Sequence, residues 1–254
     1  MKYILGSIRV LLMVIYTLLQ TSCLYMDGWI NGASVERGFK HRRIWARNAL
    51  FLLGIKVDAI TGRLPTESGL LISNHRTLLD PIIQLAYIDA FIIAKAEVAK
   101  LPAISQGARA TGIIFVKREK LKSRYAARQK TEELLNTGYN VLVYAEGTTI
   151  VTRTTGTFKI GTFAIAAAND IPIIPVAIEY PKEKDYWFEA SMAKQIFGQI
   201  GSWRTRVKLH IGEPLKGSDA QHLMKTVKSE IDQNLIKMQQ GWSEIFVEDK
   251  PTVS

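Results

Sequence analysis

The string NHRTLLD at residues 74–80 places a histidine, His75, five positions before a carboxylate, Asp80. A histidine held by a carboxylate can remove the proton from an alcohol, because the carboxylate fixes the ring and stabilises the imidazolium that forms. The spacing alone is weak evidence, since such a pair also arises by chance. The chemistry that it suggests is general-base activation of a hydroxyl group.

The two side chains can meet only if the segment between them turns. Positions five apart on a helix lie about 140° apart around its axis and do not share a face. Pro81 disfavours helical conformation at Asp80 and suits the first position of a helix, which predicts that Asp80 is the N-cap. His75 would then lie in the loop after a strand at residues 69–73. The alternative is a plain Asp-Pro helix start beside an exposed histidine.

Two cations follow a β-rich run in the string GIIFVKR at residues 112–118. Arg118 could hold a phosphate through two parallel hydrogen bonds, and Lys117 could add a compact charge. The alternative is a solvated charge pair with no ligand.

A carboxylate leaves a buried strand in the string YAEGTT at residues 144–149. Open α/β sheets bind ligands at this end of their strands, and Gly147 permits a ligand to approach the backbone closely. Glu146, Gly147 and Thr148 are therefore candidate binding residues, although a polar turn with an exposed glutamate explains them equally well. A fourth string, IPIIPV at residues 171–176, is expected to be a packed strand, or one wall for an acyl chain.

The rest of the chain after residue 55 alternates between short β-rich runs and helical periodicity. Strands are predicted at residues 56–61, 69–73, 91–95, 113–117, 140–145, 173–179 and 206–211, and helices at 81–90, 122–136, 160–168 and 219–239, with Asp219 as a cap. This alternation predicts an α/β fold with a largely parallel central sheet flanked by helices.

The N-terminal part reads as a helical membrane anchor. Residues 10–26 carry no charge, Lys2 and Arg9 precede them, and a basic stretch follows at residues 34–55 after a turn expected at Gly28, Asn31 and Gly32. A hairpin that dips into one leaflet keeps all these cations on one side, whereas a single span would not. A cleaved signal peptide is the third alternative. We therefore expect a membrane-associating hairpin at residues 1–55 and a catalytic domain at 56–254.

Composition agrees with an anionic membrane as partner. The chain has 254 residues, a formal net charge of +10 and an isoelectric point near 9.6. Basic charge beside an apolar anchor favours anionic lipid over nucleic acid, for which no module signature is found. The single Cys23 excludes an intrachain disulfide and a cysteine-based metal cluster.

Taken in order, the four strings resemble the 1-acylglycerol-3-phosphate acyltransferase family of glycerolipid acyltransferases over about residues 70–180. The family's blocks are N-H-x4-D, G-x-x-F-x-x-R, E-G-T-R and V-P-x-x-P-V. The matching positions here are Asn74, His75 and Asp80; Gly112, Phe115 and Arg118; Glu146, Gly147 and Thr148; and Pro172, Pro175 and Val176, with Ile171 for the leading valine.

The resemblance implies transfer of a fatty acyl group from acyl-CoA or acyl-carrier protein to the sn-2 hydroxyl of lysophosphatidic acid, without a metal or another cofactor. It implies His75 as the base and Asp80 as its orienter, with Asn74, Lys117, Arg118, Glu146, Gly147 and Thr148 at the substrates. The enzyme would work on the cytoplasmic face of the cell membrane.

One position departs from the family pattern, because Thr149 stands where the third block has arginine. Arg153 or Lys159 could supply the missing cation. The departure keeps another acceptor open, such as lyso-ornithine lipid or a lysophospholipid. The remaining alternative is a membrane-binding protein of the same fold without catalysis.

Overall fold

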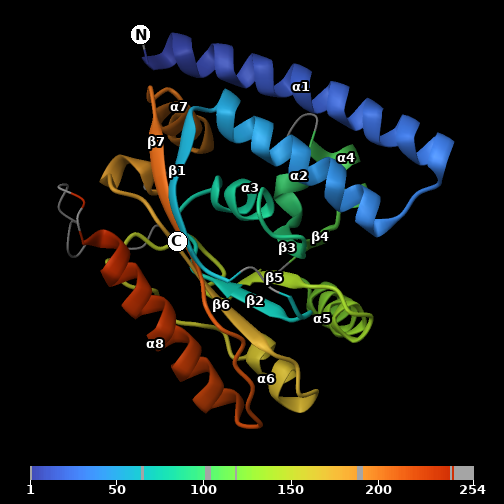
Figure 1. Cartoon of the computed structure of the whole chain (residues 1–254), viewed down its shortest axis with the longest axis vertical. Helices are drawn as coiled ribbons and strands as arrows, with labels where there is room; N and C mark the ends of the chain where they lie inside the picture. Colours follow the sequence, from blue (N-terminus) through green and yellow to red (C-terminus); the bar gives the residue numbers. More distant parts are fainter. Residues whose placement is uncertain are drawn as a thin grey trace.

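A seven-stranded sheet forms the centre of the molecule in this computed structural model, which describes residues 2–63, 66–100, 104–117, 119–187, 191–240 and 242 (Figure 1). The strand order is β1-β7-β6-β2-β5-β3-β4, and every neighbouring pair is parallel except β6 and β7. The strands are β1 (Ile55–Gly62), β2 (Leu70–Ser73), β3 (Phe91–Lys95), β4 (Ile113–Val116), β5 (Val141–Tyr144), β6 (Ile173–Glu179) and β7 (Thr205–Ile211).

Helices cover both faces of the sheet. The α-helices in the described residues are α1 (Lys2–Asn31), α2 (Val35–Leu52), α3 (Asp80–Leu85), α4 (Ile104–Ala110), α5 (Leu121–Asn136), α6 (Gly161–Ala168), α7 (Met192–Ile200) and α8 (Ala220–Gln239), with short 3-10 turns at Ala96–Lys100 and Glu183–Asp185. One face packs against α2 and α3, and the other packs against α5, α6 and α8. The expected α/β fold with a largely parallel sheet is therefore confirmed.

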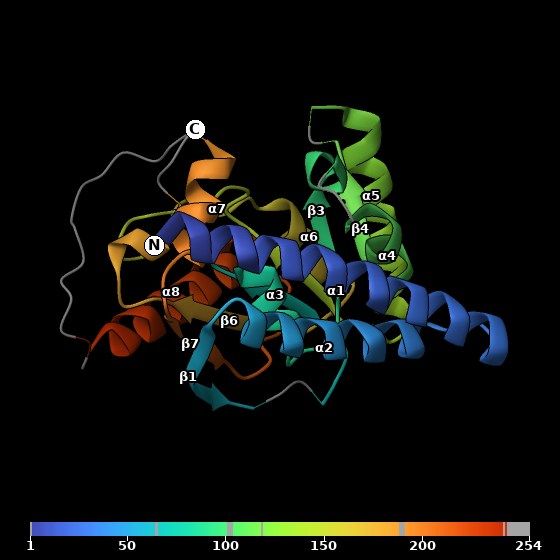
Figure 2. The same cartoon turned by 90° about the horizontal axis from the view of Figure 1, so that it is seen from above.

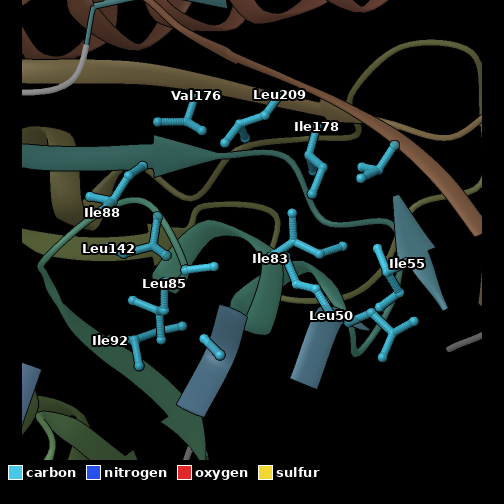
Figure 3. Close-up of a cluster of buried hydrophobic side chains, with 14 of the residues drawn as sticks. Leu50, Ile55, Ile83, Leu85, Ile88, Ile92, Leu142, Val176, Ile178 and Leu209 are labelled. Carbon is cyan, nitrogen blue, oxygen red and sulfur yellow. The ribbon is translucent and has the colours of Figure 1, made fainter. Parts of the chain in front are cut away.

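Alternation along the strands builds the two cores. Leu71 of β2 belongs to the cluster under α2 and α3, whereas Leu70 and Ile72 belong to the cluster under α8. Figure 3 shows the first cluster, in which Ile83 of α3 and Leu50 of α2 point toward side chains of the sheet. The central strands are thus buried on both faces, which is why β5 and β6 are apolar without interruption.

The expected elements agree closely with the observed ones except after Asp80. The helix predicted at residues 81–90 ends at Leu85. The chain must reach β3 at Phe91, and the side chain of Asn140 donates a hydrogen bond to the carbonyl of Asp89, which fixes the connecting loop. Asp219 caps α8 as predicted, because its carboxylate accepts hydrogen bonds from the amides of Gln221 and His222.

Helices α1 and α2 form an antiparallel pair across the top of the molecule (Figure 1). The turn lies later than expected, at residues 32–34, since α1 continues through Gly28 and Asn31. Gly32 has a φ of +81°, and the Ser34 hydroxyl caps α2 by accepting a hydrogen bond from the amide of Arg37. Helix α2 contacts α3 and supplies residues to the hydrophobic core, so α2 is part of the helical layer on this face of the sheet.

Arg9 joins α1 to the body of the protein. Its side chain is buried, and the guanidinium donates hydrogen bonds to the carbonyls of Ile200, Ser202 and Trp203 at the end of α7. These carbonyls have no partner within a helix, so a cation is favourable there. Arg9 was expected only to flank a membrane segment, and its contacts with the end of α7 were not predicted.

The opposite face of α1 is apolar and exposed. Its exposed large side chains include Ile8, Leu11, Ile15, Leu18 and Leu19. Helix α1 is long and apolar enough to cross a membrane by length and composition, although such a helix near an N-terminus is weak evidence for a span. Figure 2 shows that α1 lies along the molecule beside α2, from α7 toward α4.

The basic residues of α2 mostly contact protein. Arg42 is buried and bonds to the carbonyl of Thr111, Arg43 pairs with Asp89, and Arg47 donates to the carbonyl of Ala86. Each of these three arginines thus has a protein acceptor, and attraction of the basic stretch to anionic lipid stays a prediction.

Candidate active site

The turn between β2 and α3 brings His75 and Asp80 together. The Nδ1 atom of His75 lies 2.8 Å from Oδ2 of Asp80, and the Asp80 side chain is fully buried. The same Oδ2 accepts hydrogen bonds from the backbone amides of Arg76 at 2.6 Å and Thr77 at 2.9 Å. One oxygen of the carboxylate therefore accepts from two backbone amides and also holds one nitrogen of the imidazole.

Asp80 does not cap α3 in the predicted way. Leu79 is the N-cap, Asp80 is the first helical residue, and no side chain bonds to the amides of this helix end. The carboxylate instead points back over the turn, toward the amides of Arg76 and Thr77. The two residues still meet across a turn, so the predicted juxtaposition is present with a different local geometry.

The imidazole of His75 is held from its other side by Tyr144, the last residue of β5. The ring centroids lie 4.1 Å apart with an interplanar angle of 19°. The Tyr144 hydroxyl donates to Gln84 at 2.7 Å, and Gln84 donates to the hydroxyl of Ser73. In the described residues the Nε2 atom of His75 has no protein partner, which leaves this nitrogen for a substrate proton.

The side chain of Asn74 bonds to the backbone of β6. Its amide donates to the carbonyl of Ile178 at 2.9 Å and accepts from the amide of the same residue at 2.8 Å, and the side chain is fully buried. The oxygen and nitrogen of this side chain both bond to Ile178, and contact of Asn74 with substrate stays a prediction. Asn74 holds the end of β2 against β6 and so positions the residue that follows, His75.

Glu146 is also turned inward. One carboxylate oxygen accepts from the amide of His75 at 2.8 Å and the other from the amide of Gly156 at 3.0 Å. Burial raises the pKa of this carboxyl to about 7, against the opposing effect of the Gly156 amide and the Arg76 charge. Glu146 thus joins the segments that carry His75 and Gly156, and its contact with substrate stays a prediction.

Gly147 and Lys159 lie against each other at the mouth of the site. Gly147 has a φ of +75°, and a Cβ built there would lie 2.5 Å from Nζ of Lys159. Only glycine fits this position without displacing the lysine. The amide of Lys159 bonds to the carbonyl of Ala145, its side chain is exposed, and Thr148 is exposed beside it.

Further cations lie along the same edge of the sheet. The carboxyl ends of β2, β5, β3 and β4 share one edge because these strands are parallel. Lys117 follows β4 and is exposed, whereas Arg118 lies outside the described residues. Lys95, at the end of β3, is paired in register with Val116 and was missed by the sequence analysis. Its place after a predicted strand was the available signal.

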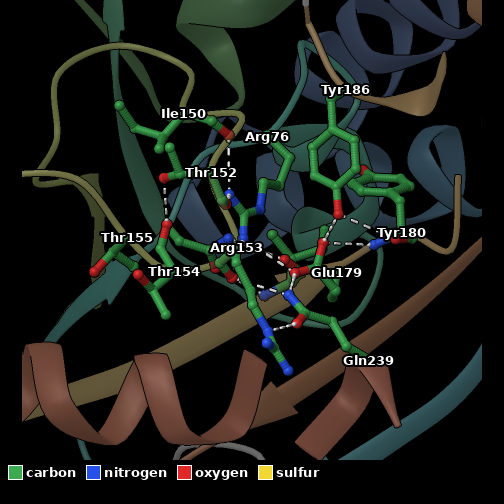
Figure 4. Close-up of polar contacts among 12 residues, drawn as sticks. Arg76, Ile150, Thr152, Arg153, Thr154, Thr155, Glu179, Tyr180, Tyr186 and Gln239 are labelled. Atoms are coloured by element: carbon green, nitrogen blue, oxygen red, sulfur yellow. Dashed lines mark hydrogen bonds and ion pairs between the residues drawn. The ribbon is translucent and has the colours of Figure 1, made fainter. Parts of the chain in front are cut away.

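Arg76 is the second residue that the sequence analysis missed. It is fully buried and forms an ion pair of 3.0 Å with Glu179 (Figure 4). It also donates to the carbonyls of Ile150 and Thr152 in the loop after β5. Although desolvation by burial lowers it, the charge of Glu179 raises the pKa of Arg76 above its usual value. No pattern in the sequence distinguishes this arginine from a solvated one.

The site defines a class of chemistry. A histidine has one nitrogen held by a buried carboxylate, and exposed lysines follow strands whose carboxyl ends share the same edge of the sheet. In the described residues no group of three or more His, Cys, Asp or Glu side chains could hold a metal ion. A histidine held in this way has the geometry that a general base needs.

The comparisons agree with this class. A model of the acyltransferase family matches residues 56–179. A 1-acyl-sn-glycerol-3-phosphate acyltransferase of Borreliella burgdorferi is 30% identical over 135 residues, which cover 51% of this chain and 54% of that protein. A chloroplast enzyme of the same name from Arabidopsis thaliana is 25% identical over 206 residues, 79% of this chain and 55% of that protein. A lyso-ornithine lipid O-acyltransferase of Pseudomonas aeruginosa is 30% identical over 49% of this chain and 48% of its own length.

The fold is similar to a solved structure as well. The 1-acyl-sn-glycerophosphate acyltransferase of Thermotoga maritima superposes with a TM-score of 0.66 at 20% identity, covering 94% of this chain and all of that one. The chain spans about half the length of the curated relatives it matches. The chain is therefore similar to the acyltransferase family over about half of its length, and all four motif blocks lie in the matched region.

Proposed function

We propose that the protein transfers a fatty acyl group from acyl-CoA or acyl-carrier protein to the sn-2 hydroxyl of lysophosphatidic acid, giving phosphatidic acid. The observation that carries the proposal is the His75–Asp80 pair, with the contact of 2.8 Å on Nδ1 and a free Nε2. The names of several relatives point to the same acceptor.

In the proposed reaction, one proton moves from the acceptor hydroxyl to His75 and then from His75 to the leaving thiolate. Nε2 of His75 takes the proton of the hydroxyl while the oxygen attacks the thioester carbonyl, and Asp80 stabilises the imidazolium. The carbon–sulfur bond then breaks, and the thiolate leaves with the proton that His75 returns. Attack is direct, because a thioester is already activated and, among the described residues, no serine, threonine or cysteine side chain bonds to His75.

Lys159 supplies the cation that Thr149 lacks in the third block. Its ammonium group lies over Gly147, next to the residue whose carboxylate holds the His75 loop. Arg153 fits this task less well, because its Nε donates to Gln239 of α8 and its carbonyl accepts from Arg76. We propose that Lys159 and Lys117 hold the acceptor phosphate, with Arg118 as the third cation of the expected group.

A second acceptor is favoured by one observation, the threonine at position 149, together with relatives named for lyso-ornithine lipid. The two acceptors are separated by assaying purified protein with labelled acyl-CoA and a panel of lysophosphatidic acid, lyso-ornithine lipid and lysophosphatidylethanolamine. Product from lysophosphatidic acid at the highest kcat/KM supports the proposal. Product only from another acceptor overturns it.

The variant His75→Ala separates an enzyme from a lipid-binding protein of this fold. Loss of the base should lower kcat by about 10² to 10⁴. His222→Ala is the matched control, because His222 lies exposed in the first turn of α8, on the far side of the sheet. Unchanged transfer by His75→Ala would contradict the mechanism.

We also propose that α1 lies in the membrane interface on the cytoplasmic side, with its exposed apolar face in the lipid. Its other face packs on α2, α4 and α7, so the helix can lie on the bilayer without leaving the protein. Deleting residues 1–33 would also remove the packing of Arg9, and point changes are therefore the sharper test.

The test places glutamate at Leu11, Ile15 and Leu19, and the control places three glutamates at Thr226, Ser229 and Gln233 on the exposed face of α8. Both variants gain the same charge. When vesicles of anionic lipid are sedimented, the α1 variant should stay in the supernatant, and the α8 variant should sediment with the vesicles. Equal binding of both variants would contradict the role of α1.

A further inference from the structure

Tyr180 is the fourth donor around the buried Asp80 carboxylate. Its hydroxyl donates to Oδ1 at 2.6 Å, whereas the imidazole of His75 and the two backbone amides all bond to Oδ2. In the described residues no other group bonds to Oδ1. The carboxylate can therefore rotate about its own axis only if it breaks the bond to Tyr180.

The end of β6 holds Tyr180 in place. Glu179 accepts a hydrogen bond from the amide of Tyr180 at 2.9 Å and also receives the hydroxyl of Tyr186. The rings of the two tyrosines meet edge to face, with centroids 6.3 Å apart. Figure 4 shows Tyr180 and Tyr186 on one side of Glu179 and Arg76 on the other.

Glu179, the last residue of β6, and Tyr180, which follows it, thus bind two residues of the turn at residues 74–80. Glu179 pairs with Arg76, and Tyr180 bonds to Asp80, so the turn is held on both sides of its backbone. Burial raises the pKa of the Tyr180 hydroxyl well above its usual value, and the charge of Asp80 raises it further. Tyr180 therefore remains a donor throughout the working pH range of a histidine base.

We propose that Tyr180 is a positioning residue for the reaction, which fixes the Asp80 carboxylate so that Oδ2 faces Nδ1 of His75 and keeps the proton of the imidazole on that nitrogen. The inference rests on the proposed function, in which Nε2 must be free to take the substrate proton. None of the four motif blocks includes Tyr180, which lies four residues after the last of them.

The test compares Tyr180→Phe with Tyr186→Phe. Both variants remove a buried hydroxyl that donates to a carboxylate and keep the ring, but only the first removes the donor to Oδ1 of Asp80, while the three donors to Oδ2 remain. A hydrogen bond to a charged group is strong enough that its loss should lower kcat about 10- to 100-fold. We expect an unchanged KM for lyso-lipid, and a change in kcat below about threefold for Tyr186→Phe.

A double-mutant cycle separates positioning from general damage to the fold. In the Asp80→Asn protein, adding Tyr180→Phe should change kcat by less than about twofold, because the carboxylate that it orients is gone. An additional loss as large as in the wild-type background would overturn the proposal. The cycle decides this point even if Tyr180→Phe lowers the melting temperature.

A spectroscopic readout makes the test independent of activity. The chain has 4 histidines, so selective 15N labelling gives few imidazole signals, and the one missing from His75→Ala is assigned to His75. Wild-type and Tyr186→Phe proteins should carry the proton on Nδ1, and Tyr180→Phe should show a mixture of tautomers. An unchanged His75 signal in Tyr180→Phe overturns the proposal. Absence of acyl transfer in wild type would instead overturn the proposed function, and the tautomer signal would still test the role of Tyr180.

Discussion

The turn at residues 74–80 and the exposed residues at the carboxyl edge of the sheet differ in how their side chains are held. In the turn at residues 74–80, Asn74, Arg76 and Asp80 are fully buried and every one of them has protein partners. At the edge, Lys117, Thr148 and Lys159 are exposed. Protein groups bond to the polar side chains of the first region, whereas the proposed function assigns the charges of the second region to the acceptor phosphate.

This difference fits two separate tasks, proton transfer in the turn and head-group binding at the exposed edge. A base must be held within tenths of an ångström of a productive geometry, and buried hydrogen bonds provide that precision. Lipid head groups enter from a membrane surface, and exposed cations can attract them from solvent and adapt to them. Changes in the turn should therefore alter kcat or stability, and changes at the edge should alter KM.

The largest effect is expected from Asp80→Asn. The amide cannot hold the imidazolium, so kcat should fall by about 10² to 10⁴ while KM for lyso-lipid changes little. The control is Asp219→Asn at the exposed cap of α8, which should leave kcat within about twofold. Equal losses in the two variants, measured as initial rates with labelled acyl-CoA, would show that the turn has no special role.

The next effect concerns the stability of the turn. Glu179→Gln leaves the charge of Arg76 buried without its partner, and the free energy of unfolding should fall by about 3 to 5 kcal/mol. Glu132→Gln breaks a solvent-exposed pair with Arg128 and should change it by less than about 1 kcal/mol. Urea unfolding of both proteins measures the difference. A stable Glu179→Gln protein would mean that the buried pair does not support the turn.

The sequence predicted the pairing in this region but not its support. Alternating strands and helices gave the fold class, and the meeting of His75 and Asp80 followed from the need for a turn before Pro81. Arg76 and Tyr180 could not be assigned, because their partners lie about 100 residues away and are fixed only when β6 pairs with β2.

Two residues expected at the substrate have protein partners that the sequence did not predict. Glu146 was expected there from its place after a buried strand, and Asn74 from the first motif block. In the structure, their side chains form hydrogen bonds with backbone groups of neighbouring segments. Which polar residue turns inward depends on the three-dimensional path of the loops, and a local pattern does not contain this path.

The buried Glu146 predicts a pH dependence of stability. Burial raises the pKa of its carboxyl from 4.5 to about 7, so the unfolded chain loses this proton at lower pH than the folded chain. The contribution of Glu146 to stability is therefore fully present below pH 4.5 and is lost as pH rises to about 7, a change of about 3 kcal/mol. In Glu146→Gln this part of the slope should vanish. Parallel curves for both proteins, from unfolding midpoints at several pH values, would contradict the assignment.

The smallest effect is expected at the edge. Lys159→Ala should raise KM for lysophosphatidic acid about tenfold, because one of several exposed cations near the phosphate is lost, while kcat stays within about twofold. Monoacylglycerol, which has no phosphate, should show no change in KM, and added salt should reduce the difference between wild type and variant. Lys130→Ala, on the exposed side of α5 beside Glu133, is the control. A fall in kcat with an unchanged KM would place Lys159 with the buried turn and remove the distinction between the two regions.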